Sequence, residues 1–323
     1  MGFFTILQSG GLLSTVQDKG RFGFMASGFS PAGAMDLPAM ECANLLVGQS
    51  SDVPVLEMTM TGVHLQTDCD CVIALTGADF AAKINDAPVQ VYRALRLRAG
   101  DVLRCGAAVR GVRGYLAAAG GFAIEPVMGS CSTSVKFSLG GFEGRKLKAG
   151  DRLALRCPQL PVSRLDDRVL PVPAHLDKTR PAQNEHEVRA VLGPQNDRFS
   201  QSGIDTFLGS WYFVTTSSDR MGIKLDGAKI ESKSGYDIIS DGIVPGSVQV
   251  PASGRPIVMM ADCQTTGGYT KIATVLSSDL HLLAQAKAGD WVRFAAVTSD
   301  EAARIARRHS AKSRRLEYAY LRV

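Results

Sequence analysis

Short apolar runs separated by turn residues follow one another along most of the chain. Runs of four to six residues rich in Val, Ile and Tyr recur about every ten residues, as at 72–76, 188–192, 212–216 and 256–260. Clusters of Gly, Pro, Asn and Asp separate them, a pattern typical of β-barrels and β-sandwiches. An Ala-Gly-Asp turn leading into an apolar strand also recurs, at 99–103, 149–153 and 288–292. The pattern predicts a mainly β protein.

Few helices are expected, and most of them are short. The clearest begins after Asp36, a favourable N-cap, accepts Pro38 in its first turn and ends at Gly48. Apolar residues at every third or fourth position between them would form its buried face. Further helices are expected at about 197–208, at 279–287 and at 299–309, the last opening with a capping-box pattern at 298–301.

The length of 323 residues fits about two domains. A polar stretch with five prolines at 157–187 divides two β-rich halves. We therefore expect an N-terminal domain at 1–165, a linker or surface excursion at 166–187, a C-terminal domain at 188–300 and a basic C-terminal helix and tail at 301–323.

Charge and composition exclude several classes of function. The net charge is +5, and the last 23 residues hold seven basic and two acidic residues, so the body of the chain is neutral. A basic tail of this kind is more typical of a solvated helix than of a nucleic-acid site. No apolar stretch is long enough to cross a membrane, and no secretory signal begins the chain. We expect a cytoplasmic protein that binds neither nucleic acid nor membrane.

The cysteines and histidines do not indicate a metal centre or disulfides. Seven cysteines and five histidines are scattered along the chain, and only Cys69 and Cys71 are closely spaced. This pair has no second pair to complete a zinc site. Reduced thiols and no metal are therefore predicted.

Two polar clusters in the first half are candidate binding sites. Asp18 and Arg21 flank Gly20, so the turn could direct both side chains at one ligand, or hold a local ion pair. Further along, Glu143 and Arg145 follow two glycines that permit positive φ angles and close approach of the backbone to an anion. No Walker or Rossmann pattern accompanies either cluster.

Two more clusters lie in the second half. Gln195 follows a Gly-Pro turn, and Asp219 and Arg220 form a charged pair after an expected strand. Arg220 could orient a carboxylate or amide substrate through its planar fork of donors, or form a structural salt bridge.

The densest cluster occupies 261–271, between two apolar runs. Polar or conformationally permissive residues crowd into this stretch without a packing reason, as expected of a binding loop on a rigid scaffold, although a surface hairpin would also fit. Lys271 could stabilise an oxyanion or act as a base, and Tyr269 could donate a hydrogen bond to a substrate carbonyl. The other candidate members of this cluster are Gln264, Thr265, Thr266, Gly267 and Gly268.

These clusters occur in the order found in a known family. The sequence resembles the biotin-dependent carboxyltransferase family, which includes the third component of bacterial 5-oxoprolinase, allophanate hydrolase subunit 2 and the antagonist of a sporulation-kinase inhibitor. The matching stretches run from about residue 10 to residue 295: 15–21, 33–36 with 43–44, 56–59, 140–145, 193–195, 218–222, 243–251 and 264–269.

The resemblance implies two cyclophilin-like β-barrel domains and an obligate smaller partner. It implies a place as the third, or C, component of an ATP-dependent 5-oxoprolinase. This hydrolase is expected to be inactive without its kinase-inhibitor-like B component and its A component. Such a complex opens the lactam of 5-oxoproline to L-glutamate. ATP would be a cosubstrate of the complex, and no covalently bound cofactor is expected.

Two alternatives remain open from the sequence. The chain could be a carboxyltransferase component that moves a carboxyl group from biotin, held on a separate carrier, to urea or another amide. It could also be a non-catalytic regulator that binds a kinase-inhibitor-like partner.

The site predicted for the leading hypothesis has two groups of residues. Lys271, Asp219 and Tyr269 are expected to be catalytic. The residues expected to bind the amide or lactam substrate are Gln264, Thr265, Thr266, Gly267, Gly268, Arg220, Asp18, Arg21, Glu143, Arg145 and Gln195.

Three positions depart from the family pattern near this site. Cys263 stands where Arg is common, Thr270 where Pro is usual, and Asp241 where Glu is common. Loss of the arginine removes a bidentate donor for an anion, whereas Lys271 and the Gly-Gly pair are kept.

Overall fold

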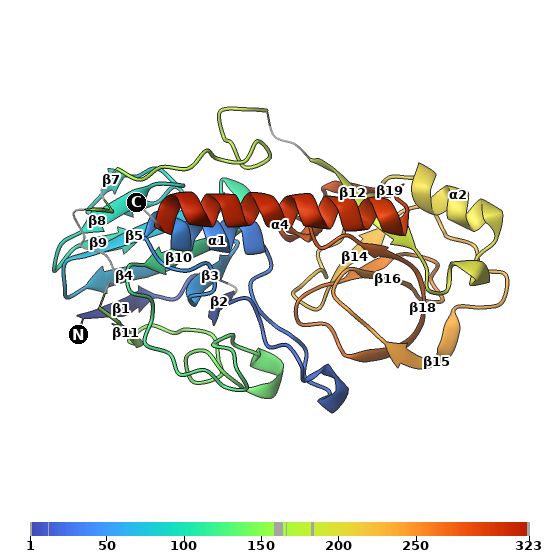
Figure 1. The fold of residues 1–323 in the computed structure, drawn as a ribbon, viewed down its shortest axis with the longest axis horizontal. Coiled ribbons are helices and arrows are strands. Elements are labelled where there is room, and N and C mark those ends of the chain that lie inside the picture. The colour runs from blue at the N-terminus through green and yellow to red at the C-terminus, as the bar shows by residue number, and fades with distance from the viewer. Residues whose placement is uncertain (1, 12, 158–163, 166, 182–183, 322–323) are drawn as a thin grey trace. The chain divides into compact units, whose positions relative to one another are not determined.

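The computed structural model describes residues 2–11, 13–157, 164–165, 167–181 and 184–321 and separates into two compact units (Figure 1). The first unit comprises Met1–Arg21, Ala32–Ala182 and Arg314–Val323. The second unit comprises Phe22–Pro31 and Gln183–Ser313. Each unit is described by itself below.

Two antiparallel sheets form the body of the first unit. One has the order β11 (Arg152–Leu155), β1 (Gly2–Gln8), β4 (His64–Thr67), β9 (Val102–Arg104), β6 (Lys83–Ile84), β7 (Ala87–Pro88). The other has the order β2 (Leu13–Gln17), β3 (Val55–Thr59), β10 (Arg110–Ala118), β5 (Cys71–Asp79), β8 (Ala94–Leu97).

The main core of the first unit lies between these sheets. Phe4 and Leu65 from the first sheet pack in one buried cluster with Ile73 and Leu116 from the second. The opposite face of the five-stranded sheet carries its own apolar residues, because successive strand residues point to opposite faces. A second cluster covers that face, where Ala74 packs with residues of α1 (Leu37–Leu46).

The helix expected after Asp36 is confirmed as α1. The side chain of Asp36 accepts a hydrogen bond of 2.9 Å from the backbone N–H of Ala39, and proline lies in the first turn. This caps a donor that the helix itself cannot satisfy. Met40 and Ala43 are fully buried, so the apolar face points to the sheet as the sequence pattern predicted.

The second unit is built on one curled sheet. Its strands follow the order β12 (Glu185–Leu192), β19 (Trp291–Ala296), β13 (Tyr212–Val214), β14 (Gly222–Asp226), β17 (Ile257–Met259), β16 (Ser247–Val250), β18 (Thr266–Val275), β15 (Asp237–Gly242). An additional pairing between β12 and β18 closes seven of these strands into a barrel, and β15 extends β18 outside the closed ring. Closure removes the free sheet edges that an open sheet would expose.

The remaining helices fall near the expected positions. Two are the short α2 (Gln201–Gly209) and α3 (Leu280–Ala284). Single-turn 3₁₀ helices form at η1 (Met25–Ser27), η2 (Val135–Phe137) and η4 (Asn196–Arg198). The mainly β architecture with few helices is therefore confirmed.

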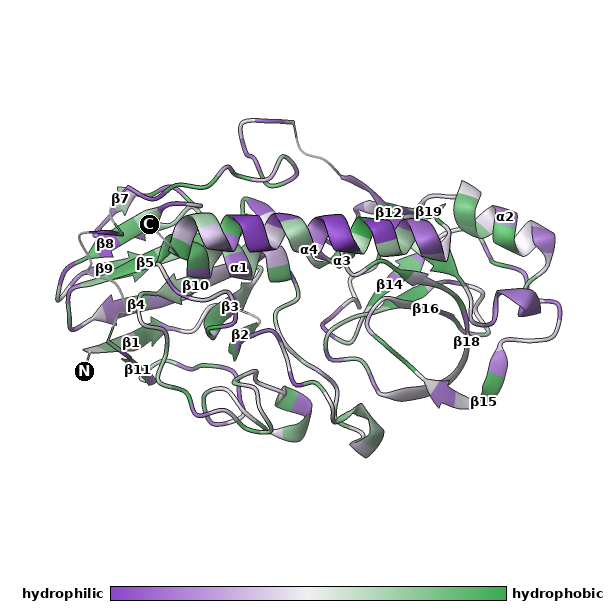
Figure 2. Cartoon of the chain, in the orientation of Figure 1, coloured by the Kyte–Doolittle hydropathy of each residue, from purple (hydrophilic) through white to green (hydrophobic). Residues whose placement is uncertain are grey.

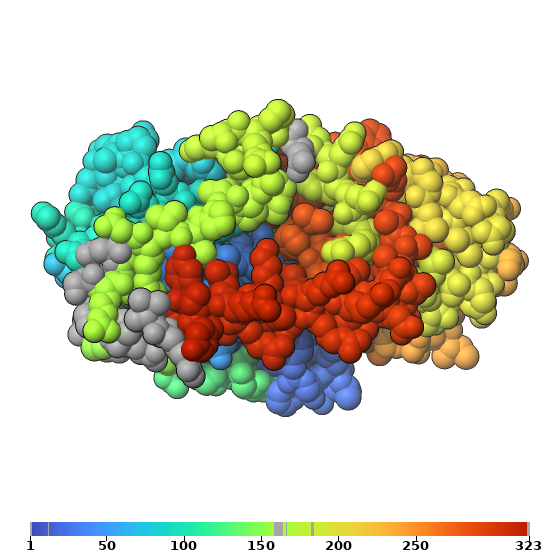
Figure 3. Space-filling view, turned by 45° about the horizontal axis from the view of Figure 1, so that its top comes forward, coloured from blue at the N-terminus to red at the C-terminus, as the bar shows by residue number. Residues whose placement is uncertain are grey.

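The last helix, α4 (Ser299–Leu321), is longer than the sequence pattern predicted. Its capping box is present, because Glu301 donates its backbone N–H to the Thr298 hydroxyl while its carboxylate accepts the Thr298 N–H. None of its described residues is buried. Figure 2 shows that most of the helix is hydrophilic, and Figure 3 shows its side chains, in red, exposed to view. The helix therefore extends through most of 301–323, a basic segment that we expected to be partly an irregular tail.

Among the described residues, no helix is long and apolar enough to span a membrane. The same part of the chain contains no group of three or more His, Cys, Asp or Glu side chains arranged to hold a metal ion.

Candidate functional site

Lys271 is the centre of the candidate site and is held inside the second unit. It lies on β18 with only 2% of its surface exposed. Its Nζ donates hydrogen bonds to Asp241 Oδ2 at 2.6 Å and to the Gly242 carbonyl oxygen at 2.8 Å. A lysine ammonium carries three donors, so one N–H has no acceptor among the described residues. A buried cation with a spare donor can bind a substrate oxygen.

Asp241 supplies the charge that compensates Lys271. The hydrogen bond from Lys271 lowers the pKa of Asp241, and the Gly242 N–H and the ammonium charge lower it further. The carboxylate is half exposed, so the ion pair lies at the boundary between barrel and solvent. The sequence flagged Asp241 as a departure from the family pattern but did not place it in the site. Only strand pairing between β15 and β18 brings it there.

Gln195 joins this cluster, although it lies far away in the sequence. Its Oε1 accepts the backbone N–H of Lys271 at 3.0 Å, and its own backbone N–H donates to the Lys271 carbonyl oxygen at 3.1 Å. Its Nε2 reaches Asp241 Oδ2 at 3.3 Å. Gln195 therefore fixes both members of the ion pair. Its predicted substrate contact stays a prediction.

Arg220 does not pair with its sequence neighbour Asp219. Its guanidinium instead forms a bidentate pair with Asp262, with distances of 2.8 and 3.0 Å. The Asp262 N–H also donates to the Arg220 carbonyl oxygen at 2.9 Å. The ion pair that we predicted between Asp219 and Arg220 from their adjacency was therefore wrong, because Arg220 pairs with Asp262 instead. The pair that forms joins the turn before β14 to the polar loop before β18.

Asp219, predicted to be catalytic, is exposed in that turn. Its Oδ1 accepts the backbone N–H groups of Met221 at 2.8 Å and Gly222 at 3.1 Å. Its other carboxylate oxygen has no donor among the described residues. The turn thus fixes the side chain and leaves one oxygen available. Tyr269 is 42% exposed on β18, opposite Asp237 of β15.

The Gly-Gly pair allows β18 to pass close to its neighbours. A Cβ on Gly267 would lie 2.5 Å from Ile243 Cδ1 and 2.8 Å from Gln249 Nε2, so a larger residue would require these side chains to shift. The same position lies 3.6 Å from Gln264 Nε2. Gly268 has a looser neighbour, the Ile238 carbonyl oxygen at 3.3 Å. Of the two threonines beside them, Thr265 is partly buried and Thr266 is exposed.

Cys263 has a packing role in this loop. The side chain is fully buried in an apolar cluster with Ile243 and Met259. Burial raises the pKa of the thiol to about 12, so the reactive thiolate is suppressed at neutral pH. The position where the family commonly has arginine therefore offers no anion donor and no nucleophile here.

Asp18 and Arg21 lie in the first unit and are nearly completely buried. Asp18 accepts hydrogen bonds from the hydroxyls of Ser130 and Ser132 and from two backbone N–H groups. Arg21 donates to the carbonyl oxygens of Val127 and Ser132, both at 3.0 Å. Burial lowers the pKa of Arg21, and the Asp18 charge partly offsets this. These bonds fasten one loop to β2, and a substrate contact of either residue stays a prediction.

Glu143 and Arg145 also lie in the first unit, where they form an ion-pair chain. Arg145 contacts Glu143 at 2.5 Å and makes two hydrogen bonds to Asp151, at 2.7 and 2.9 Å. Asp151 belongs to one of the recurring Gly-Asp turns and also accepts the Lys148 N–H. The pair therefore stabilises the turn before β11. Its predicted role in substrate binding stays a prediction.

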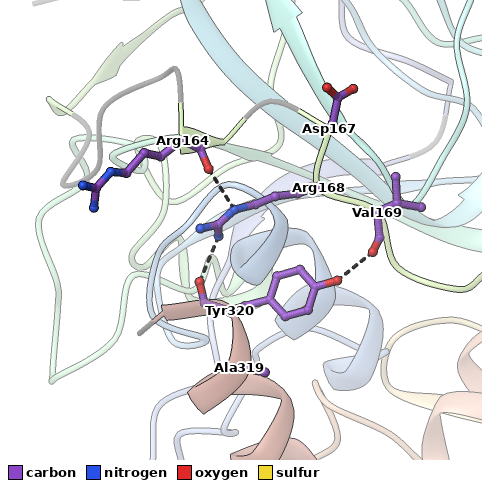
Figure 4. Close-up of a pocket in the computed structure, with 6 residues that line it drawn as sticks. All are labelled: Arg164, Asp167, Arg168, Val169, Ala319 and Tyr320. Carbon is purple, nitrogen blue, oxygen red and sulfur yellow. Dashed lines mark hydrogen bonds between the residues drawn. The ribbon is translucent and has the colours of Figure 1, made fainter. Parts of the chain in front are cut away.

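A separate pocket of about 730 Å³ in the first unit contains none of the predicted residues (Figure 4). Arg168 donates to the carbonyl oxygens of Tyr320, at 3.0 Å, and Arg164, at 3.3 Å. The Tyr320 hydroxyl donates to the Val169 carbonyl oxygen at 2.6 Å. These bonds fasten the end of α4 to this segment, which is a structural role.

Comparisons with known proteins agree with the motif pattern. The family described as "Carboxyltransferase domain, subdomain A and B" matches residues 27–296. The chain is 39% identical to the 5-oxoprolinase C component of Escherichia coli over 90% of this chain and 91% of that protein. It is 37% identical to the Haemophilus influenzae protein of the same name over 92% of each.

A solved structure of Kluyveromyces lactis urea amidolyase has a similar fold. It superposes on 97% of this chain with a TM-score of 0.86 and 26% identity, and the match spans 20% of that longer protein. The resemblance inferred from the motifs is thereby confirmed, and the chain belongs to the biotin-dependent carboxyltransferase family.

Proposed function

We propose that this chain is the C component of a heteromeric, ATP-dependent 5-oxoprolinase that opens the lactam of 5-oxoproline to L-glutamate. Near full-length similarity to two bacterial proteins of that name supports the proposal. The proposed partners are the kinase-inhibitor-like B component and the A component, and ATP is the cosubstrate of the complex. Without these partners the chain is inactive. The complex acts in the cytoplasm.

One structural observation carries the chemical part of the proposal. Lys271 is a buried cation whose position is fixed by Asp241 and Gly242 and which keeps one N–H without an acceptor in the described part of the chain. Opening a lactam places negative charge on the carbonyl oxygen, and a fixed donor in a low-dielectric site stabilises that charge strongly. As water attacks the carbonyl carbon, Lys271 would hold this oxygen and Tyr269 would donate a second hydrogen bond to it. The free oxygen of Asp219 would accept the proton released by the attacking water and return it to the lactam nitrogen as the C–N bond breaks.

The experiment is reconstitution with the A and B components of the same organism. Formation of glutamate from 5-oxoproline is followed with and without ATP, and with each component omitted in turn. The proposal predicts glutamate only when ATP accompanies all three components. A correctly assembled complex that forms no glutamate would overturn it.

Carboxyl transfer is the second candidate function. Urea amidolyase of Lachancea kluyveri is 29% identical over 90% of this chain, and the fold match to the K. lactis enzyme supports the same alternative. Under that alternative, activity depends on biotin held by a separate carrier and is abolished by avidin. Under the main proposal, avidin has no effect.

A regulatory role without chemistry gives a third pattern. A regulator needs only its binding surface. The Lys271→Met variant would then bind the B component and regulate it in the same way as the unmodified chain. A variant that binds the B component normally but supports no glutamate formation would exclude this role.

A further inference from the structure

Gln249 is a buried polar side chain that the predicted site did not include. It lies on β16 inside the second unit, with 2% of its surface exposed. Its Nε2 is shielded from solvent and has no hydrogen-bond acceptor among the described residues. A buried amide without a partner loses its bonds to water and gains none from the protein, so it lowers stability relative to a satisfied one. Such a group therefore requires an explanation.

Gln249 lies beside Lys271. The two residues are direct partners in the antiparallel pairing of β16 and β18. Residues directly opposite each other in such a pair project to the same face of the sheet. Both side chains are buried, each with 2% of its surface exposed. The strand pairing therefore places the Gln249 amide and the third N–H of Lys271 on the same face of the sheet. Neither group has an acceptor among the described residues.

Gly267 of β18 lies beside the Gln249 amide. Gln249 Nε2 lies 2.8 Å from the position that a Cβ on Gly267 would occupy, and Gln264 Nε2 lies 3.6 Å from it. Gly267 is also the register partner of Asp241, which holds Lys271. Two amide groups therefore border Gly267, and its strand partner Asp241 binds the Lys271 ammonium, so this set offers donors to a ligand oxygen.

We propose that Gln249 Nε2 donates a hydrogen bond to the carbonyl oxygen of the amide or lactam substrate, on the same side of the sheet as Lys271. The inference rests on the proposed function and adds a residue to its substrate site. A carbonyl oxygen has two lone pairs, and the oxyanion that develops from it has three, so this oxygen can accept from Gln249 as well as from Lys271 and Tyr269. The missing acceptor of Gln249 in the free chain is then supplied by the substrate.

The test compares Gln249→Met with Gln17→Met in the reconstituted complex. Methionine keeps the length of glutamine but cannot donate. Gln17 is a matched control, because it is buried in the first unit and its amide is satisfied by Thr15, Thr133 and Gly33. Thermal unfolding of each variant is measured together with kcat/KM for 5-oxoproline. Inhibition by L-proline, which lacks the lactam oxygen, is measured in parallel.

The inference predicts that Gln249→Met lowers kcat/KM by about tenfold or more. Its Tm should stay at or above the wild-type value, while Gln17→Met lowers the Tm. Inhibition by L-proline should be unchanged, because this ligand keeps the carboxylate but has no lactam oxygen for Gln249 to bind. This combination assigns the lost bond to the lactam oxygen.

Three results would overturn the inference. A wild-type kcat/KM in Gln249→Met would remove Gln249 from the site while leaving the proposed function intact. A fall in Tm as large as that of Gln17→Met, or equal losses for 5-oxoproline and L-proline, would assign Gln249 to structure. An assembled wild-type complex that forms no glutamate would overturn the proposed function, and this inference with it.

Discussion

Asp18 in the first unit and Lys271 in the second unit are both buried charges on or beside a strand, yet their hydrogen bonding differs. Asp18 uses both carboxylate oxygens for four donors from its own chain. Among the described residues, Lys271 finds acceptors for two of its three donors and lies beside Gln249, whose amide Nε2 has no acceptor.

This difference in hydrogen bonding indicates that Asp18 stabilises the fold, whereas Lys271 is available to bind a ligand. A buried polar group that is fully paired contributes to stability, and its removal leaves several partners unsatisfied. A buried donor left unpaired lowers stability and therefore requires an explanation, of which a role in binding a ligand is one. The comparison therefore predicts that changes at Asp18 act on folding and changes at Lys271 act on turnover.

The largest effect is expected for Asp18→Ala. The change leaves two serine hydroxyls and two backbone N–H groups without their acceptor, and removes a negative charge that favours the charged form of buried Arg21. Breaking a buried charged network of this kind costs about 3–5 kcal/mol of unfolding free energy. Denaturant unfolding of the isolated chain measures it.

Glu187→Ala is the control for this prediction. Glu187 is a half-exposed carboxylate paired with Arg293 on the barrel surface, so its removal should cost at most about 1 kcal/mol. Equal losses for the two variants would show that the Asp18 network does not stabilise the fold.

The next effect is expected for Lys271→Met, measured on the reconstituted complex. Loss of one donor to a developing oxyanion lowers kcat by about 10²–10³-fold. The Tm should change little, because the remaining partner Asp241 is half exposed and can be hydrated. Lys224→Met, an exposed lysine on β14, should keep the wild-type rate. A Lys271→Met complex that turns over normally would contradict the assigned role.

A somewhat smaller effect is expected for Asp219→Asn. Asparagine keeps an oxygen that can accept from Met221 and Gly222, so the turn is preserved. If the second carboxylate oxygen takes part in proton transfer, kcat falls by about 10²-fold at unchanged Tm. If Asp219→Asn retains full activity while Asp219→Ala does not, the side chain serves the turn alone.

The sequence predicted features that depend on neighbouring residues. The start of α1 followed from Asp36 and Pro38, and the capping box of α4 followed from 298–301, because caps are satisfied within one turn. The alternating strands predicted the mainly β class. Lys271 was identified because a polar cluster between two apolar runs has no packing reason.

Features that depend on strand register could not be predicted in the same way. Asp241 reaches Lys271, and Gln249 faces it, only through the pairing of β18 with two other strands. Arg220 likewise binds Asp262 across a sequence separation of 42 residues, whereas adjacency suggested Asp219. Partners of this kind require the closed barrel, whose register the local pattern does not specify.

The smallest effect is expected from the titration of Asp241, and it tests how Lys271 is held. The hydrogen bond from Lys271 lowers the pKa of Asp241 below that of an unfolded chain. The stabilisation from this ion pair is therefore present above the ordinary pKa of about 4 and is lost as the pH falls through the lower folded value. The Tm difference between the wild type and Asp241→Asn should thus stay constant from about pH 7 to about pH 5 and shrink only below about pH 4. The difference should be small, because the carboxylate is half exposed and solvent screens it. A difference that disappears above about pH 5 would show that Lys271 does not hold Asp241 ionised, and the spare donor on Lys271 would then lose its fixed position.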